Sequence, residues 1–419
     1  MKYRPFIMAV AMLALVLSSA KITRAQSFGI ELHNNLMPAS GAMGGASIAA
    51  PQDVQSAIGG NPSTLSQYRG TTFSFSGGWI EGTYNLSYDG SNQLLNQAGL
   101  GPFAAKSGAP GSALGNIAVA HEMSVLGRPL TWGTALMSAS GASAEWRGVP
   151  NANGTSVALT VLDIATGAGM DVTDRLSVGA TIGLGTGTLD GPFLGATAAA
   201  VAYSLRGRVG VDYDLTDCTT LGLYYQTKAS YQFDNNIRLP NPGPQGDIYL
   251  DTEIELPQNL GVGISNRRLM DGRLLLACDV LYKQWTEAKF MGALYEDQWA
   301  IQLGSQYDAG RIKLRLGYTW CTNPIRDNPP GIISGIIPGG GAPGVEYVQS
   351  TLAVVNPHRL SGGVGIRDAL PGVDLDIFAG GMFRGSEDFV NGAVTTDLQA
   401  YWVGAGLTWH FCRGAGDAK

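Results

Sequence analysis

Apolar and polar residues alternate with a period of two through most of this chain, from about Thr71 to about Phe411. Successive side chains of a β-strand point to opposite faces, so this pattern predicts strand after strand with one apolar and one polar face. In the segment 175–188 the apolar residues share one parity, that is, they occupy every second position: Leu176, Val178, Ala180, Ile182 and Leu184. The pattern fits two architectures: a soluble β-sandwich with its charges toward water, or a membrane barrel with its apolar faces toward lipid.

Charged side chains share one parity within each segment, and they decide which face meets which solvent. Arg206 and Arg208 alternate with Leu205 and Val209, and Arg311, Lys313 and Arg315 alternate with Ile312, Leu314 and Leu316. An Arg or Lys turned toward lipid at the bilayer midplane costs about 2–4 kcal/mol. In a barrel the charged parity therefore faces the lumen. The residues predicted to line it are Arg206, Arg208, Glu253 and Glu255.

The number of strands and the spacing between them favour the barrel. The alternating segments number about fourteen, near 71–80, 113–123, 130–143, 156–170, 175–188, 197–213, 219–233, 248–265, 273–286, 298–307, 311–321, 358–367, 373–384 and 398–411. Short connections such as 171–174 and 308–310 alternate, for the most part, with long ones such as 81–112, 144–155, 323–357 and 385–397. Short periplasmic turns and long outer loops are typical of outer-membrane barrels. An even strand number places both termini on the periplasmic side.

The first 25 residues have the form of a secretory signal peptide. Lys2 and Arg4 precede the apolar run Phe6–Leu17, and small residues offer cleavage sites after Ala20 or Ala25. The alternative, a retained anchor, needs about 20 apolar residues. We therefore predict export to the outer membrane of a two-membrane bacterium: signal peptide 1–25, an N-terminal segment 26–70, an all-β barrel of about fourteen strands over 71–411, and a periplasmic tail 412–419.

The composition and the absence of known motifs argue against several classes of function. Charged residues make up 14% of the chain, against roughly 25% in soluble domains. The net charge is −6 with no basic run, which argues against a nucleic-acid partner. The four histidines and four cysteines show no spacing typical of metal or redox sites. Whether any of the cysteines form a disulfide, and which ones, stays open. No catalytic constellation or phosphate-binding loop is recognisable, so we expect neither an enzyme nor a cofactor.

Residues 26–70 do not alternate. Small residues, helix caps and turns dominate, and about 45 residues cannot bury a core alone. Two interpretations stand: a flexible leader, or a plug that folds inside the barrel and takes its missing burial from the lumen wall.

The order of residues in this segment supports the plug. A Gly-rich stretch leads to Ala49-Ala50, Asp53, Asn61-Pro62 and Leu65, and then to an aromatic first strand. This order resembles the hatch of the outer-membrane long-chain fatty acid transporter (FadL-type) family, which also includes channels for toluene and related hydrocarbons. The resemblance implies passive uptake of a hydrophobic small molecule that the lumen captures and hatch movement releases. It also implies a monomer surrounded by outer-membrane lipid, and hatch residues that bind ligand or gate, namely Phe28, Asp53, Asn61 and Pro62.

The same resemblance implies a kinked third strand beside a lateral opening toward the membrane. In this chain that strand is 130–143, where Gly133 and Gly141 permit a kink. Lateral and periplasmic exit both stay open. The loop 323–357 carries an apolar stretch that is either an external capture surface or loop-on-loop packing: Ile332, Ile333, Ile336 and Ile337.

Two other functions remain open at this point. A general polar porin is favoured by the lumen charges, and a structural or adhesive barrel needs no ligand at all. The choice between a fatty acid and an aromatic hydrocarbon as ligand is also open.

Overall fold

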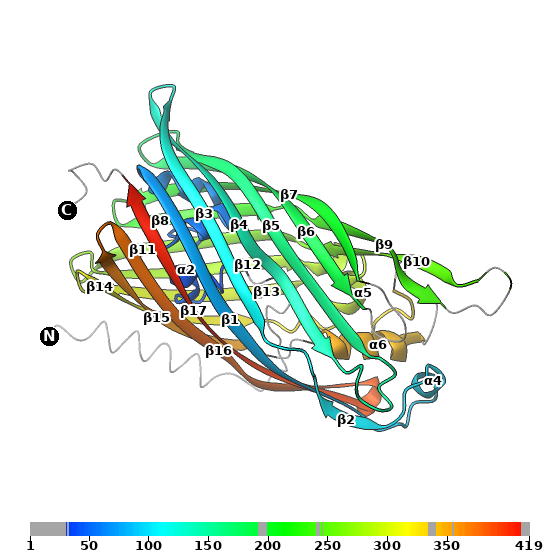
Figure 1. Ribbon diagram of the computed structural model, residues 1–419. Helices are drawn as coiled ribbons and strands as arrows, with labels where there is room; N and C mark the ends of the chain where they lie inside the picture. Colours follow the sequence, from blue (N-terminus) through cyan, green and yellow to red (C-terminus); the bar gives the residue numbers. More distant parts are fainter. Residues whose placement is uncertain are drawn as a thin grey trace.

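The computed structural model describes residues 31, 33–191, 199–239, 244, 246–333, 341–353 and 356–411. The predicted signal peptide, Phe28, Ile336, Ile337 and the predicted tail lie outside these residues. The described strands form a 15-stranded antiparallel sheet and a separate 2-stranded sheet. Strand β2 (Phe103–Lys106) pairs only with the far end of β1. The remaining fourteen strands of the large sheet close into a barrel, as predicted (Figure 1).

The barrel strands follow one another in chain order around the wall. They are β1 (Thr71–Tyr88), β3 (Ser112–Val125), β4 (Arg128–Glu145), β5 (Ser156–Asp171), β6 (Leu176–Asp190), β7 (Ala200–Thr216), β8 (Thr219–Gln226), β11 (Gln258–Leu269), β12 (Leu274–Gln284), β13 (Gln298–Asp308), β14 (Ile312–Cys321), β15 (His358–Leu370), β16 (Val373–Phe389) and β17 (Val394–Phe411).

The barrel closes between its first and last strands. β1 and β17 pair along their whole length, from Thr71 with Phe411 to Tyr88 with Val394. Short turns join the strands at the end where β1 begins, and the longer connections gather at the other end (Figure 1). The connection between β16 and β17 is an exception, because both strands run on through most of the predicted loop 385–397. Closure leaves no edge strand of the wall unpaired at this seam, as a strand in lipid requires.

Two predicted strands are each broken in two. The segment 219–233 divides into β8 and β9 (Ala229–Leu239), and 248–265 divides into β10 (Ile248–Leu256) and β11. Pro257 lies at the second break, where its missing N–H cannot join a ladder. β9 and β10 form the separate two-stranded sheet, which extends beyond the rim (Figure 1). The prediction that Glu253 and Glu255 line the lumen wall is therefore wrong.

These two carboxylates pair with lysines instead. Glu253 lies 2.8 Å from the ammonium of Lys289, and Glu255 lies 3.7 Å from that of Lys228. Both lysines are at least a third exposed, so these pairs contribute little to stability.

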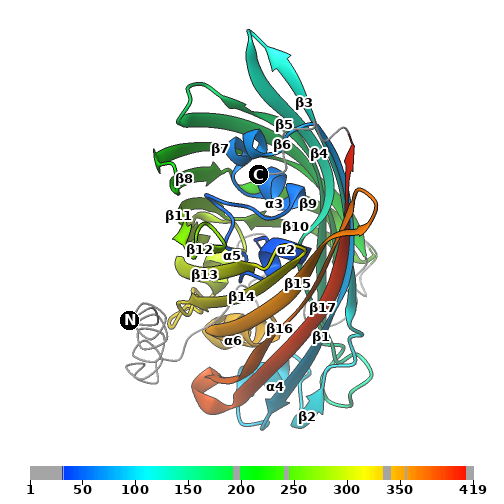
Figure 2. The same cartoon turned by 90° about the vertical axis from the view of Figure 1, so that its left-hand side faces the viewer.

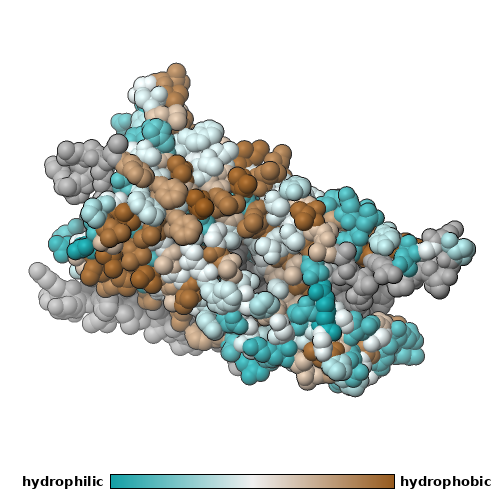
Figure 3. Space-filling view, viewed as in Figure 1, coloured by the Kyte–Doolittle hydropathy of each residue, from teal (hydrophilic) through white to brown (hydrophobic). Residues whose placement is uncertain are grey.

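The two faces of the wall have the predicted characters. Leu205 and Leu316 are 63% and 59% exposed on the outer face, whereas Arg206 and Arg208 on the inner face are 6% and 4% exposed. Hydrophobic side chains gather over the middle of the barrel, and hydrophilic ones are concentrated toward the end with the longer loops (Figure 3). The apolar outer belt is the surface that lipid covers.

Short helices lie among the connections: α4 (Gln93–Gln97), η2 (Trp285–Glu287), α5 (Met291–Leu294), α6 (Gly341–Thr351) and η3 (Val390–Gly392). Within the described residues, every helix is too short or too polar to cross a membrane. The loops, the β9–β10 sheet and these helices share a large apolar core that includes Trp146, Phe233, Phe290 and Tyr347. Ile333 joins this core, as the loop-packing interpretation predicts, while Ile332 remains 58% exposed.

Candidate functional site

The segment before β1 lies inside the barrel (Figure 2). It consists of α2 (Pro38–Gly41), α3 (Val54–Gly59) and η1 (Pro62–Gln67), joined by turns. Ile48, Ile58 and Leu65 are fully buried. The wall supplies the burial that so short a segment cannot provide for itself.

Glycines on the inner face of the wall make room for this segment. A Cβ atom at Gly210 would collide with the side chain of Asn61, and one at Gly317 would collide with the backbone of Gly44. The polar parity is therefore rich in glycine because a folded segment, not open water, lies against it.

Asp53 holds two helices of the segment together. Its Oδ1 accepts a hydrogen bond from Ser56 N at 2.9 Å, which caps the N-terminus of α3. Its Oδ2 accepts from Ala39 N at 3.1 Å and from Ser40 N at 2.8 Å, at the start of α2. The carboxylate is 6% exposed, so these three bonds are shielded from water.

Asn61 fixes the segment to the wall. Its Nδ2 donates to Ile48 O at 2.7 Å and to Asp212 Oδ1 on β7 at 2.8 Å. Its Oδ1 accepts from Ser63 N at 3.2 Å and from the Ser63 hydroxyl at 2.7 Å. Pro62 begins η1, where its missing N–H costs nothing. The Asn-Pro element is thus an anchor with all four amide positions satisfied.

A second carboxylate of the wall, besides Asp212, also anchors the N-terminal segment, and this role was not predicted. Asp279 on β12 accepts from Ser47 N at 2.6 Å and from Ile48 N at 2.9 Å. Sequence alone gives no sign of this role, because the partners are backbone groups about 230 residues away.

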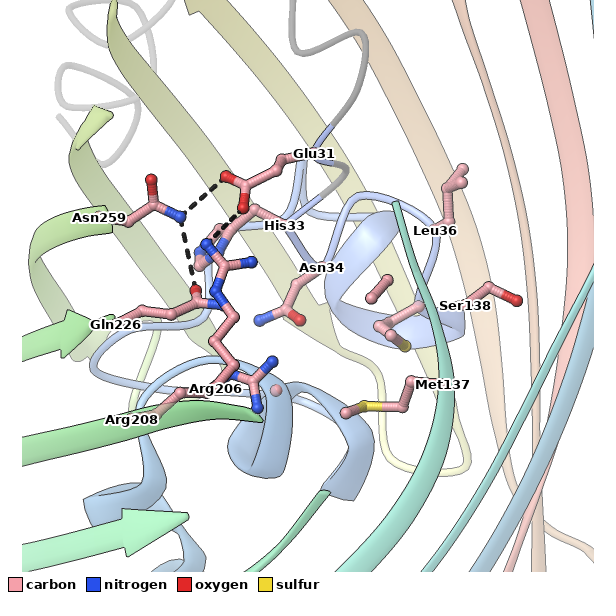
Figure 4. Close-up of a pocket in the computed structure, with 13 residues that line it drawn as sticks. Glu31, His33, Asn34, Leu36, Met137, Ser138, Arg206, Arg208, Gln226 and Asn259 are labelled. Carbon is pink, nitrogen blue, oxygen red and sulfur yellow. Dashed lines mark hydrogen bonds and ion pairs between the residues drawn. The ribbon is translucent and has the colours of Figure 1, made fainter. Parts of the chain in front are cut away.

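A buried ionic cluster lies at the start of the segment (Figure 4). The Glu31 carboxylate lies 2.6 Å from Arg206 and 3.1 Å from Lys283, and it accepts from Asn259 Nδ2 at 2.8 Å. Burial by itself would raise the pKa of Glu31, but the two cations and the hydrogen bonds outweigh it and lower the pKa to about 2. Arg208 pairs separately with Asp163 on β5. The predicted lumen charges Arg206 and Arg208 are therefore paired with acids.

The wall is irregular at the third barrel strand. The pairing of β4 with β5 slips between Ser138 and Ser140. The pairing of β3 with β4 stops at Ile117 and Leu136, although both strands continue beyond those residues. At this level the backbone of Glu31 forms a bridge with Ser140. The two strands leave a gap in the ladder of the wall, beside the start of the N-terminal segment.

The two glycines of this strand have different surroundings. Gly141 follows the slip directly and borders the gap. Gly133 lies in continuous register with both neighbouring strands. A Cβ atom there would lie 2.9 Å from Ile58 Cδ1 and 3.0 Å from Leu65 Cδ2, so Gly133 makes room for the buried segment. The irregularity of the pairing is thus near Gly141, whereas the pairing at Gly133 is regular on both sides.

A cavity of about 400 Å³ reaches from the interior to this gap. Its inner part is lined mostly by apolar side chains, among them Leu36, Ile80, Tyr84, Leu159, Met382 and Trp402. Its outer part borders Ser112, Ala113 and Leu114 of β3 and Ser140 to Ser143 of β4. Leu162, which also lines it, is 42% exposed on the outer wall. The cavity therefore joins the lumen to the lipid-facing surface.

A second, smaller cavity is lined by charged and apolar residues alike. It measures about 50 Å³ and lies between Glu31, Arg206, Arg208 and the residues 137–139 of β4 (Figure 4). A water molecule needs roughly 10–15 Å³ by this measure, so this space holds a few waters and no organic ligand. Among the residues that the structure describes, no cluster of histidine, cysteine and acidic side chains is suited to a metal ion.

A closed barrel with an apolar outer belt and a folded segment in its lumen defines an outer-membrane β-barrel with an internal plug. No protein-family model matches the chain, and no curated protein matches its sequence. Solved structures do match its fold. The Pseudomonas putida toluene transporter TodX matches with a TM-score of 0.65 and 16% identity over 91% of this chain and 100% of its own.

Two further structures give the same result. A Pseudomonas aeruginosa FadL homologue matches with a TM-score of 0.66 and 14% identity over 93% of this chain and 100% of its own. The Ralstonia pickettii toluene transporter TbuX matches with a TM-score of 0.60 and 17% identity over 90% of this chain and 99% of its own. The fold is that of the FadL-type outer-membrane transporters, as the hatch-like sequence predicts.

Proposed function

We propose that this protein is an outer-membrane channel for the passive uptake of hydrophobic small molecules. The observation that carries the proposal is the largely apolar cavity of about 400 Å³ that opens at the gap between β3 and β4. Transfer of a ligand from water into such a cavity is favourable by about 0.8 kcal/mol for each methylene buried. The toluene transporters TodX and TbuX have the same fold, which supports the same class of ligand.

The ligand enters from the outer face, occupies the cavity and leaves sideways into the membrane through the gap. Lateral exit suits a hydrophobic ligand because the path never returns it to water. Leu162 and Ala113 border this path. Ile332 is exposed among the outer loops and is a candidate for first capture.

The N-terminal segment acts in this proposal as the hatch, and movement of its start changes the gap. Glu31 forms a bridge with Ser140 at the slip in β4, so displacement of Glu31 alters the strand that borders the gap. Asp53, Asn61 and Pro62 hold the rest of the hatch in place during this movement. Phe28 remains a proposed gating residue.

The polar-porin alternative receives less support. The hatch lies beside Arg206 and Arg208 in the lumen, and both arginines are paired with acids. A structural or adhesive barrel would not need a cavity that reaches the lipid-facing wall.

Filling the cavity tests the proposal. Ala142 lines the cavity, so A142W should reduce the uptake of a radiolabelled fatty acid and of toluene by cells that make the protein, at least severalfold. The matched control A168W places the same side chain on β5, opposite Trp132 and away from the cavity, and should leave uptake unchanged. Undiminished uptake by A142W contradicts the proposed path. Swelling of proteoliposomes in sugars would instead establish the porin.

A further inference from the structure

The turn between β3 and β4 differs from the other short turns at the same end of the barrel. Two residues, Leu126 and Gly127, join the paired residues Val125 and Arg128, and none of the four is acidic. Each of the other short turns carries at least one aspartate: Asp174, Asp217, Asp271, Asp308 and Asp368. An ionised carboxylate strongly favours water, so the other turns face the periplasm. The β3–β4 turn does not have this constraint.

The hairpin of β3 and β4 also leaves the wall of the barrel. β1 begins at Thr71, opposite His121, and the pairing of β4 with β5 ends at Leu130. The residues 123–129 therefore extend past both neighbouring strands as a two-stranded ribbon. In two perpendicular views this ribbon projects sideways beyond the outline of the barrel (Figure 1, Figure 2). A ribbon that leaves the wall sideways at the periplasmic end meets the inner leaflet of the surrounding membrane.

The ribbon is amphipathic, and its apolar face continues the lipid-covered belt of the wall. Met123 and Val125 are exposed and have the outward parity of β3. Leu130 of β4 pairs with Met123 and belongs to the same face. Glu122 and Ser124 have the opposite parity. Hydrophobic side chains are visible up to the end of the ribbon (Figure 3). The surface that lipid covers on the wall thus extends onto the ribbon without a break.

Leu126 lies at the tip of the ribbon in an unfavourable conformation. Its side chain is 94% exposed, and its φ is 53°, followed by 75° at Gly127. A two-residue hairpin turn with positive φ at both positions favours Asn-Gly, because a leucine meets steric hindrance there. A leucine that is both strained and bare contributes nothing to the fold of the isolated chain. Its presence is explained if an apolar environment outside the protein covers it.

We propose that the tip of the β3–β4 hairpin docks into the inner leaflet of the outer membrane, with Leu126 among the acyl chains and Arg128 at the phospholipid phosphates. Arg128 pairs with Val125 on the apolar face, and its aliphatic stem lets the guanidinium reach the phosphates. The ribbon stays in the head-group region, because both of its backbone edges are unpaired and need water. The proposal is independent of the ligand. It concerns the two strands that border the gap, and it would fix their periplasmic end to the membrane.

Photo-cross-linking in living cells identifies what covers the tip. The photoreactive residue p-benzoylphenylalanine replaces Leu126 in the full-length protein, which is irradiated, purified and analysed by mass spectrometry. We expect an adduct with the mass of one phospholipid. The same photoreactive residue in place of Asp174, in the β5–β6 turn, is the control and should give severalfold less of this adduct.

A second variant tests the contribution of Leu126 without disturbing the turn. L126N removes the apolar side chain and places the residue that such a turn favours. The photoreactive residue then replaces Val125, with and without L126N. Loss of the leucine should shift the equilibrium between docked and free tip by about tenfold and lower the yield of the phospholipid adduct severalfold. The control L370N removes a leucine that is exposed near another short turn and should leave the yield unchanged. A gel shift on heating verifies that each variant is folded.

Each remaining outcome overturns the proposal. An adduct with a second copy of this chain, or with another protein, shows that the tip is a protein-docking surface. Absence of any adduct at position 126, or an equal yield at position 174, shows that the tip lies in water. A yield at position 125 that L126N does not change removes the role of the leucine. None of these results depends on uptake, so the proposed channel is tested separately.

Discussion

Replacing Asn61 with alanine should release the hatch while the barrel stays closed. The substitution removes four hydrogen bonds, to Ile48 O, to Asp212 Oδ1 and to the backbone and hydroxyl of Ser63, at a residue with no solvent exposure. Each bond contributes about 0.5–1.5 kcal/mol net, and water entering the new space recovers part of the loss. We expect the free energy of local opening to fall by about 2–4 kcal/mol.

Amide hydrogen exchange followed by mass spectrometry measures this loss directly. A decrease of 2–4 kcal/mol corresponds to exchange roughly 30 to 700 times faster. The acceleration should be confined to peptides covering 44–67, since the strand pairing of the wall is not touched. The control N266A removes an amide that bonds to Thr219 near the short turns, and hatch exchange should then stay at the wild-type rate. If N61A also leaves hatch exchange at the wild-type rate, the anchoring role of Asn61 is refuted.

Two more predictions concern the packing and the charge of the hatch. The variant G317V drives a side chain into the backbone of Gly44 and should displace that part of the hatch. We expect it to lower the free energy of unfolding by about 1–3 kcal/mol and to accelerate proteolysis of the hatch. The control G207V, on the outer face, should have neither effect. The pKa of Glu31 lies near 2, below its ordinary 4.5, so its charged form stabilises the fold above pH 4.5. The free energy of unfolding should fall by about 3 kcal/mol as the pH falls from 4.5 through 2. Thermal unfolding of E31Q should lack this part of the pH dependence.

The architecture of the wall could be predicted from the sequence because neighbouring residues of a strand face lipid and lumen in turn, and the two environments favour opposite residue types. Charged residues such as Arg206 and Arg208 cannot alternate with exposed leucines in any other way at acceptable cost. The same rule failed at Glu253 and Glu255, where the alternation continues but the strand does not. Pro257 at the break was the available signal, since proline interrupts a ladder.

Less of the interior of the barrel could be predicted from the sequence. Asp53 and Asn61 were identified through their resemblance to a known hatch, but their partners are backbone groups and wall residues that no local pattern reveals. Glu31, which joins the hatch to two cations of the wall, lies outside every motif. Its role depends on three strands and the N-terminal segment meeting at one point, and such meetings are set by the closed barrel and not by spacing along the chain.

The buried charges of the lumen argue for a hydrophobic channel once their partners are known. Unpaired, Arg206 and Arg208 would indicate a polar pore; Arg206 instead pairs with Glu31 of the hatch, and Arg208 pairs with Asp163 of the wall. Removing either partner would leave a buried charge uncompensated, at about 3–5 kcal/mol. The cluster therefore keeps the hatch in the lumen and blocks a straight aqueous path. In the proposed function the apolar cavity at the side gap is then the path for a ligand, and the gap in the wall is its exit.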